Sequence, residues 1–355
     1  MSHLPQRILF IGGSMNQTTQ MHQVAKELGE FDCYFTPYYA DGLLDLIRKA
    51  GLLEPTVLGN KHIRRNVRYL REQNLRIDFQ GRQGNYALVV TSSDLVIPRN
   101  IRASTIVLVQ EGMTDPEGIL FRLVKRFRFL PRWLTSTAAT GLSDAYARFC
   151  VASEGYRELF IRKGVKPEKI VVTGIPNFDN CAQYLKNDFP HKHYVLVCTS
   201  DTRETWAYEN RKRTLRNAVR IAKGRPLIFK LHPNENVRRA TAEIKRWAPD
   251  ALVYSTGKTE EMIANCDVLI TRFSTTVYVG LALGKEVYSE FDINDLRHLT
   301  PLQNGRAAKN IAEVCRAALQ ESTPAPPSQP SGRRRPLRWR SKRYETSHSE
   351  ALEER

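Results

Sequence analysis

Residues 229–236 read Phe-Lys-Leu-His-Pro-Asn-Glu-Asn and are the most informative part of this sequence about its fold. Apolar residues lead through Lys230 to His232, and Pro233 begins a helical pattern. The stretch therefore predicts a strand that ends in a cluster of polar groups. Ligands of open α/β sheets bind at the carboxyl ends of strands, which makes Lys230 and His232 candidate ligand-binding residues. A surface His-Pro turn is the alternative interpretation of such a short match.

Strand and helix patterns alternate on both sides of this stretch, from residue 194 to residue 320. The apolar run at 194–200 predicts a strand, and a helix is expected at 209–223. Further strands are expected at 251–254 and 267–271, each preceded by helix-like sequence. The region 194–320 is therefore predicted to form an α/β sheet of its own.

The first half of the chain shows the same alternation and begins with a strand at 7–13. This strand ends in Gly12 and Gly13, and Ser14 leads into a helical pattern. A strand, a small-residue loop and a helix form the first unit of a doubly wound sheet. Because the loop lacks the G-x-G-x-x-G spacing, it predicts no dinucleotide cofactor, and a plain tight turn is the alternative to a binding loop.

Two later strands of the first half end close to carboxylates. The strand at 86–94 ends in hydroxyl residues and Asp94, and the strand at 105–112 carries Glu111 near its end. Parallel strands end at the same edge of a sheet, so both carboxylates are candidates for general acid or base catalysis. Loop acids that cap helices would produce the same pattern.

The length of the chain, 355 residues, exceeds the usual size of a single core, so two α/β domains are expected. We predict an N-terminal Rossmann-like domain at 1–180, a linker at 181–193 and a C-terminal Rossmann-like domain at 194–320. Residues 321–355 have the composition of a disordered basic tail.

Six scattered cysteines without a C-x-x-C spacing predict reduced core residues, and the sequence has no D-x-D motif, so no metal is expected.

The formal net charge of +17 implies anionic partners. The tail at 321–355 contributes eight Lys or Arg against five Glu, so +14 of this charge belongs to residues 1–320. Phosphorylated metabolites and an acidic membrane surface are both compatible with this excess. The sequence contains no recognisable nucleic-acid-binding motif, so a nucleic-acid partner is not expected.

Residues 118–134 combine apolar residues at helical spacing with Arg and Lys around them, a pattern typical of a helix on an anionic membrane surface. The arginine cluster at 333–343 is a second candidate for membrane contact. An ordinary core helix and an inert tail are the alternatives.

No apolar run reaches the roughly 20 residues that span a bilayer, and the N-terminus lacks a signal-peptide pattern. We therefore expect a cytoplasmic protein in peripheral contact with the inner face of the cell membrane.

Two α/β domains with polar clusters on facing carboxyl edges resemble the GT-B glycosyltransferase architecture. Three local matches support the resemblance: Gln-Glu-Gly at 110–112, Lys-Leu-His-Pro at 230–233 and Phe-Ser-Thr-Thr at 273–276. They fall in the order of the acid-Gly, His-Pro and Ser-Ser/Thr motifs of bacterial sialyltransferases and related polysialyl and Kdo transferases. The CDP-glycerol polymerases look similar in the last two motifs.

This resemblance implies an inverting, metal-independent transferase without a cofactor. It would move a sugar or polyol phosphate from a nucleotide-activated donor to a glycan or lipid-linked acceptor, as in the synthesis of a capsule or another surface polysaccharide. By position, Glu111 would be the general base and His232 would stabilise the departing phosphate. The further nucleotide- or phosphate-binding residues would be Ser200, Arg203, Lys230, Glu235, Asn236, Ser274, Thr275 and Thr276. The acceptor-side loop would be Gly12, Gly13 and Ser14.

A second resemblance competes with the first. The stretch 232–236 is similar to the His-x-x-Glu-Asn motif of non-hydrolysing UDP-N-acetylglucosamine 2-epimerases, and Asp94 matches the aspartate of their Gly-Asp-Thr. The chain differs from that family at 13–15, where the family carries Gly-Thr-Arg-Pro-Glu, and at 273–278, where it carries Ser-Gly-Gly and paired glutamates. These differences favour a transferase. A nucleotide-sugar-binding protein without turnover is the non-enzymatic alternative.

Overall fold

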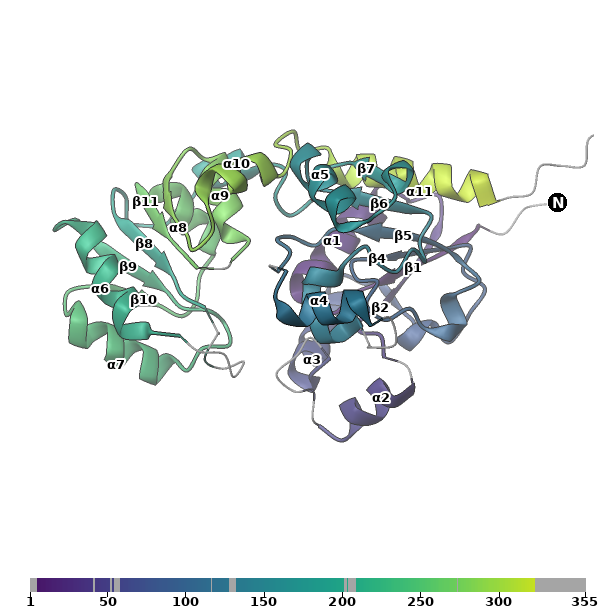
Figure 1. Ribbon diagram of the computed structural model, residues 1–355, viewed down its shortest axis with the longest axis horizontal. Helices are drawn as coiled ribbons and strands as arrows, with labels where there is room; N and C mark the ends of the chain where they lie inside the picture. The colour runs from purple at the N-terminus through teal and green to yellow at the C-terminus, as the bar shows by residue number, and fades with distance from the viewer. Residues whose placement is uncertain are drawn as a thin grey trace, which may run out of the picture. The chain divides into compact units, whose positions relative to one another are not determined.

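The structure is a computed structural model that describes residues 5–322, except 41, 52, 54–57, 116, 128–131, 201–202, 204–208 and 273. Within this part of the chain the strands form one sheet of seven strands and one of five (Figure 1). Residues 323–355, which hold most of the predicted basic tail and its cluster at 333–343, lie outside the described residues.

The first sheet is built from β1 (Arg7–Ile11), β2 (Asp32–Thr36), β3 (Arg76–Ile77), β4 (Leu88–Thr91), β5 (Thr105–Val109), β6 (Arg148–Val151) and β7 (Ile170–Val172). Their order in the sheet is β3-β2-β1-β4-β5-β6-β7, and every recorded pair is parallel. Strand β4 is buried along its whole length, as expected for a parallel strand that is covered on both faces.

The helices of this half are α1 (Met15–Lys26), α2 (Gly42–Lys49), α3 (Asn60–Glu72), α4 (Ile119–Arg126) and α5 (Glu154–Lys163). Local sequence explains several of their ends. Ser14 and Gln17 form a capping box at the start of α1, in which each side chain accepts the backbone N–H of the other. Ser153 caps α5, and Gly164 ends it in the left-handed conformation that favours glycine.

The second sheet contains β8 (Val195–Cys198), β9 (Leu227–Lys230), β10 (Leu252–Tyr254), β11 (Val268–Ile270) and β12 (Glu286–Tyr288). Their order is β10-β9-β8-β11-β12, again with parallel pairs. The helices that connect them are α6 (Arg211–Ala222), α7 (Val237–Trp247), α8 (Thr259–Asn265), α9 (Thr276–Ala282) and α10 (Ile293–Leu299). The octapeptide at 229–236 thus begins in the middle of β9 and ends at Asn236, which caps α7.

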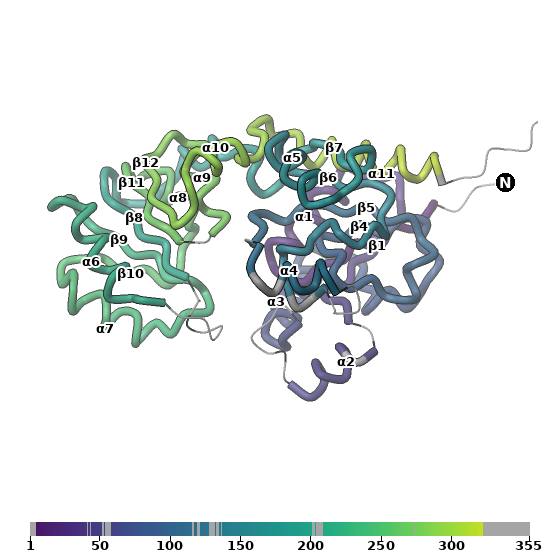
Figure 2. Tube along the Cα trace, viewed as in Figure 1, coloured from purple at the N-terminus to yellow at the C-terminus, as the bar shows by residue number. Residues whose placement is uncertain are grey.

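The last described helix, α11 (Ala307–Ser322), does not belong to the second sheet. It packs on α1, β5 and β6 (Figure 2), and its buried residues Ile311, Cys315 and Leu319 share a core cluster with strands of the first sheet. Residues 307–320, which the sequence assigned to the C-terminal domain, therefore pack against the first sheet. An apolar helical stripe predicts burial, but it does not say against which sheet.

The segment predicted at 118–134 as one amphipathic helix is divided in the structure. Helix α4 ends at Arg126, residues 128–131 lie outside the described residues, and the 3-10 helix η3 covers Arg132–Ala139. Two large apolar side chains are exposed here, Leu123 of α4 by 43% and Phe127, just past the end of α4, by 45%. Among the described helices, none is long and apolar enough to cross a membrane.

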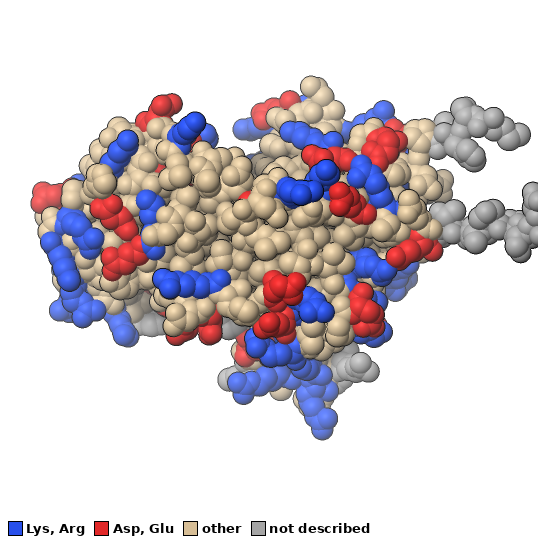
Figure 3. Space-filling view, turned by 90° about the horizontal axis from the view of Figure 1, so that it is seen from above, with Lys and Arg blue, Asp and Glu red and all other residues tan. Residues whose placement is uncertain are grey.

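Basic side chains occur at several separate places on the face of the molecule that Figure 3 shows. In the face shown in Figure 3, Lys and Arg occur in several places with Asp and Glu among them. Helix α3 alone carries five exposed cations. They are Lys61, Arg64, Arg65, Arg68 and Arg71. Part of the positive charge therefore lies on the solvent-exposed side of α3, in the first half of the chain.

Replacing Ile311 by Ala tests the position of α11. Ile311 is fully buried between α11 and the first sheet, so Ile311→Ala should lower the free energy of unfolding by about 2–5 kcal/mol in urea denaturation. Glu313→Ala, on the exposed face of the same helix, should change it by less than about 0.5 kcal/mol. If Ile311→Ala and the parent protein unfold at the same urea concentration, α11 does not pack on the first sheet as described.

Candidate functional site

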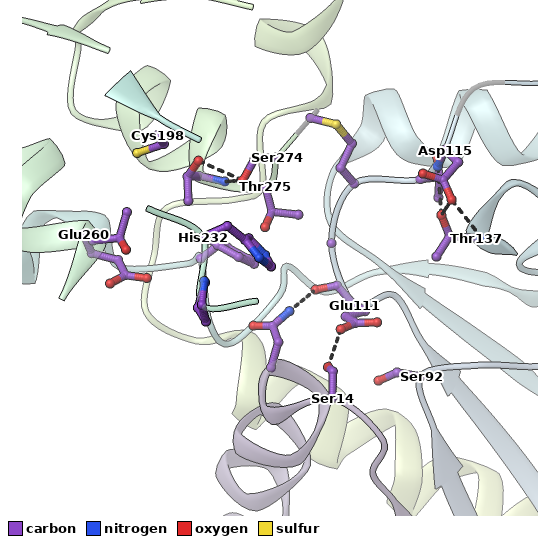
Figure 4. A pocket seen from close by; sticks show the side chains of 18 of the residues that line it. Ser14, Ser92, Glu111, Asp115, Thr137, Cys198, His232, Glu260, Ser274 and Thr275 are labelled. Atoms are coloured by element: carbon purple, nitrogen blue, oxygen red, sulfur yellow. Dashed lines mark hydrogen bonds between the residues drawn. The ribbon is translucent and has the colours of Figure 1, made fainter. Parts of the chain in front are cut away.

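A cavity of about 580 Å³ is lined by residues at the carboxyl ends of both sheets (Figure 4). The first sheet contributes the loops that follow β1, β4 and β5, and the second sheet contributes those that follow β8, β9 and β11. This volume is in the range of about 300–1,000 Å³ that small-molecule sites have. The cavity is therefore the candidate functional site.

Glu111 enters the cavity from the loop after β5, and both oxygens of its carboxylate accept hydrogen bonds. Ser14 Oγ donates to Oε1 at 2.6 Å, and Gln17 Nε2 donates to Oε2 at 2.7 Å. Asn16 Nδ2 also donates to the backbone oxygen of Glu111 at 3.4 Å. The carboxylate is thus held by the first turn of α1, which lies 94 or more residues earlier in the chain.

Gln110 makes the loop that carries Glu111 rigid. Its side chain is buried, donates from Nε2 to the Gly112 oxygen at 2.8 Å and accepts the backbone N–H of Ala152 at 2.9 Å. Gln20, one turn into α1, donates to the backbone oxygen of Gln110 at 2.9 Å. A buried amide with these partners fixes the loop in one conformation.

His232 lines the opposite side of the cavity, just past β9. Its backbone N–H donates to Thr199 Oγ1 at 3.0 Å, and the backbone N–H of Asn234 donates to its Nδ1 at 3.3 Å. Because Nδ1 acts as an acceptor, the proton of the neutral imidazole is placed on Nε2. The ring is therefore set up as a hydrogen-bond donor through Nε2.

The turn at 274–276 lies beside His232 and contributes three hydroxyl groups to the lining. Thr276 donates from its hydroxyl to Ser274 Oγ at 3.0 Å. Lys230, at the end of β9, also lines the cavity, with its Nζ 3.3 Å from the Leu231 oxygen. Burial lowers the pKa of Lys230. The second-sheet side of the cavity thus offers hydroxyl, imidazole and ammonium donors together.

The loops from the two sheets touch at Gly112. A Cβ on Gly112 would lie 2.5 Å from Thr275 Cγ2, so a side chain at this position would collide with the 274–276 turn. The loop of Glu111 and the turn of Thr275 therefore pack directly against each other. At Gly12 the tight turn after β1 has a similar requirement, because a Cβ there would lie 2.6 Å from Thr18 Oγ1.

Several residues predicted for the site lie elsewhere. Asp94, which was predicted to be catalytic, is buried and accepts the backbone N–H groups of Gly141 and Ser143, both at 2.9 Å, so its carboxylate anchors a loop. Glu235 is also buried, and it accepts hydrogen bonds from Thr199 and Arg211. Neither carboxylate lines the cavity.

The remaining predicted phosphate-binding residues also serve the fold. Arg203 pairs with both carboxylate oxygens of Glu243, at 2.9 and 2.7 Å. Asn236 caps α7 by accepting the backbone N–H of Arg239 at 3.1 Å. Ser200, like Arg203 and Asn236, is absent from the lining of the cavity. Of the loop predicted on the acceptor side, Ser14 lines the cavity, while Gly12 and Gly13 form the turn behind it.

Other residues of the cavity were missed. Glu260, at the start of α8, and Cys198, at the end of β8, line the second-sheet side, and Ser92, Thr137 and Thr140 line the first-sheet side. Ser92 directly follows β4 in the hydroxyl-rich exit noted in the sequence, which was the available signal. Glu260 belongs to no sequence motif that could have identified it.

Comparisons with known proteins place the fold. No protein-family model and no curated protein matches the sequence. Among solved structures, UDP-GlcNAc 2-epimerase from Methanocaldococcus jannaschii matches with a TM-score of 0.52 at 12% identity, over 88% of this chain and 100% of that one. The enzyme from Neisseria meningitidis, bound to UDP-GlcNAc, matches with a TM-score of 0.53 at 11% identity, over 87% and 99%. These likenesses show a shared fold.

The wall teichoic acid polymerase TagF is also among the similar structures, with a TM-score of 0.44 at 10% identity over 89% of each chain. The predicted α/β architecture of two GT-B-like, Rossmann-type sheets is confirmed.

The contact between Gly112 and Thr275 can be tested by a double-mutant cycle. Gly112→Ala should lower the free energy of unfolding by about 1–3 kcal/mol because its Cβ overlaps Thr275 Cγ2. Thr275→Ser removes that methyl group, so the double variant should recover part of the loss, with a coupling energy of about 0.5–3 kcal/mol. Gly29→Ala, where no atom lies within 4 Å of the added Cβ, is the control. Strict additivity of the two changes would show that the loops do not touch.

Proposed function

We propose that the protein is a transferase that moves a sugar or polyol phosphate from a nucleotide-activated donor to an acceptor hydroxyl. One observation carries the proposal: a single cavity has the Glu111 carboxylate on its first-sheet side and His232 with the 274–276 hydroxyls on its second-sheet side. An acceptor and a leaving phosphate need these two kinds of group, and they need them on opposite sides of the transferred group.

In the proposed reaction the acceptor oxygen forms a bond to the transferred carbon or phosphorus, and its proton passes to Glu111. The donor's bond to the nucleotide phosphate oxygen breaks, and its electron pair stays on that oxygen. His232 Nε2–H, with the hydroxyls of Ser274 and Thr275, would donate hydrogen bonds to the charge that develops there. Lys230 would add a positive charge on the same side.

The nucleoside would extend toward Glu260. A carboxylate accepts hydrogen bonds only, and ribose offers two neighbouring hydroxyl donors. Glu260 lines the cavity on the second-sheet side, beside the phosphate-facing residues. We place the donor nucleotide on the second sheet and the acceptor against Ser14, Ser92 and Glu111 on the first. Neither a metal nor a cofactor takes part in this proposal, which follows the prediction from the sequence.

A UDP-N-acetylglucosamine 2-epimerase is the second candidate, because solved epimerases share the fold. The chain retains less of that family's site than its sequence suggested. Asp94, which matched an aspartate of the epimerases, does not line the cavity, and Glu235 of the His-x-x-Glu-Asn match is buried against Arg211. The residues that distinguish the two candidates therefore favour the transferase.

We further propose that the acceptor is a glycan or lipid-linked precursor at the inner face of the cell membrane. Leu123 lies on α4 and Phe127 directly follows its last residue; both are exposed, and the exposed cations Arg122 and Arg126 precede them in the sequence. This combination suits a short helix that rests on an anionic lipid surface. A surface-polysaccharide precursor would be presented at such a surface.

The donor side is tested by thermal unfolding in the presence of CMP, CDP, UDP and GDP. One nucleotide should stabilise the protein, by about 2.7 kcal/mol when its concentration is a hundred times its dissociation constant. The stabilisation should be much weaker in Ser274→Ala and His232→Ala, and unchanged in His298→Ala, whose exposed imidazole pairs with Glu158 outside the cavity. If none of the four nucleotides raises the melting temperature, the transferase proposal fails.

Turnover separates the two candidates. With a donor of the selected nucleotide, His232→Ala should lower kcat by about 10²–10³, the loss typical of one oxyanion donor. Incubation with UDP-N-acetylglucosamine alone, followed by NMR, tests the epimerase, because that reaction needs no acceptor. Formation of the 2-epimer without an acceptor would replace the proposal by its alternative.

A further inference from the structure

The capping box of α1 does more than begin the helix. The same two side chains that cap it, Ser14 and Gln17, each make one further hydrogen bond, and both of these bonds end on Glu111. One donor reaches Oε1 at 2.6 Å and the other reaches Oε2 at 2.7 Å. Every oxygen of the proposed base is therefore contacted by a residue whose orientation the helix start determines.

The cap determines which atom of Gln17 faces Glu111. Gln17 Oε1 accepts the backbone N–H of Ser14 at 3.3 Å, so the amide carbonyl is turned toward the cap. The NH₂ group must then point the other way, and it donates to Glu111 Oε2. The side chain is nine-tenths buried, with 9% exposed, so it has little freedom to leave this position.

The cap determines the direction of the Ser14 proton in the same way. Ser14 Oγ accepts the backbone N–H of Gln17 at 3.0 Å, which uses a lone pair of the hydroxyl. Its own proton is then free to be donated, and Glu111 Oε1 lies at 2.6 Å. A hydroxyl carries one donor and two acceptor positions, so both contacts are made at once.

Glu111 also takes the place of a helix acid. The first turn of α1 contains no Asp or Glu, although negative charge is favourable at the N-terminal end of a helix. The carboxylate that lies there comes from the loop after β5, and Asn16 and Gln20 of the same helix hold the backbone of that loop. Helix α1 thus fixes both the side chain and the main chain of the 110–111 segment.

From this geometry we infer that Ser14 and Gln17 are positioning residues for the base. They hold the two carboxylate oxygens so that the remaining lone pairs face the cavity, where the acceptor hydroxyl must arrive. The inference rests on the proposed function for its catalytic consequence, but the contact itself does not. Loss of the hydrogen bond from Ser14 or from Gln17 should leave binding of the nucleotide-activated substrate intact. It should lower the rate, because a base that is displaced by about 1 Å can lose about 10²-fold in rate.

The test replaces Gln17 by Glu and by Met. In Gln17→Glu two carboxylates meet where Nε2 and Oε2 now lie 2.7 Å apart, so one of them must hold a proton near neutral pH. The acid limb of the pH profile of kcat/KM, measured by nucleotide release, should move up by one pH unit or more. Gln17→Met should lower kcat by 10- to 100-fold with the donor KM unchanged. Ser14→Ala should lower kcat as Gln17→Met does, and Ser14→Thr, which keeps the hydroxyl, should have the kcat of the parent protein.

Gln23→Glu is the matched control. It adds the same charge to the same helix, but Gln23 Nε2 donates to Asn177 and not to Glu111. Its pH profile should equal that of the parent protein. If Gln17→Glu and Gln23→Glu give the same profile, the inference is overturned.

A readout without turnover keeps this inference separate from the proposed function. In ¹³C-labelled protein the carboxyl carbon of Glu111 should titrate at higher pH in Gln17→Glu than in Gln23→Glu. If the parent protein is inactive but this shift is seen, the proposed reaction is refuted and the positioning role of Ser14 and Gln17 is supported. If the parent protein is active but neither the titration nor the rate responds to the change at Gln17, the reaction is supported and the positioning role is refuted.

Discussion

Parallel pairing of the strands determines where the functional groups of this protein meet. Because every recorded pair in both sheets is parallel, each sheet brings the carboxyl ends of its strands to one edge. Residues one to four positions past a strand therefore meet other such residues from distant parts of the sequence. Glu111, His232 and Ser274 are separated by more than 160 positions at their extremes, and they line one cavity.

The two edges are kept together by contacts that allow little substitution. Gly112 packs against Thr275, and the hydroxyls of Tyr156 and Tyr278 are hydrogen-bonded at 2.6 Å in a buried position between α5 and α9. One core cluster includes buried residues of both sheets. In addition, α11 returns from the second sheet to the first, so the chain crosses between them twice. The site is therefore assembled from loops that the core itself holds in place.

The sequence was informative about several side chains at strand ends, although Ser200 and Asp94 also follow strands and do not line the cavity. His232, Lys230, Glu111 and the 274–276 hydroxyls were identified because apolar runs locate strands, and strands locate the edge. It was less informative where a side chain's direction depends on a partner far along the chain. Asp94 turns toward the backbone of Gly141 and Ser143, a choice that nothing near residue 94 reveals.

The dependence of a side chain's direction on distant partners also explains the other differences between the predicted and the observed site. Glu235 and Arg203 have the chemistry of ligand-binding residues, but Arg211 and Glu243 satisfy their charges within the second half of the chain. Conversely, Glu260 lines the cavity from the start of α8, although no motif in the sequence marks it as a ligand-binding residue.

In the proposed reaction, one cavity holds the donor phosphate and the base on opposite sides. A crystal structure of the protein with the nucleotide that stabilises it would show this arrangement. We expect a phosphate within hydrogen-bond distance of His232 Nε2 and the hydroxyls of Ser274 or Thr275, with the Glu111 carboxylate across the cavity. A nucleotide bound away from these residues, or with its phosphate against Glu111, would refute the proposed arrangement.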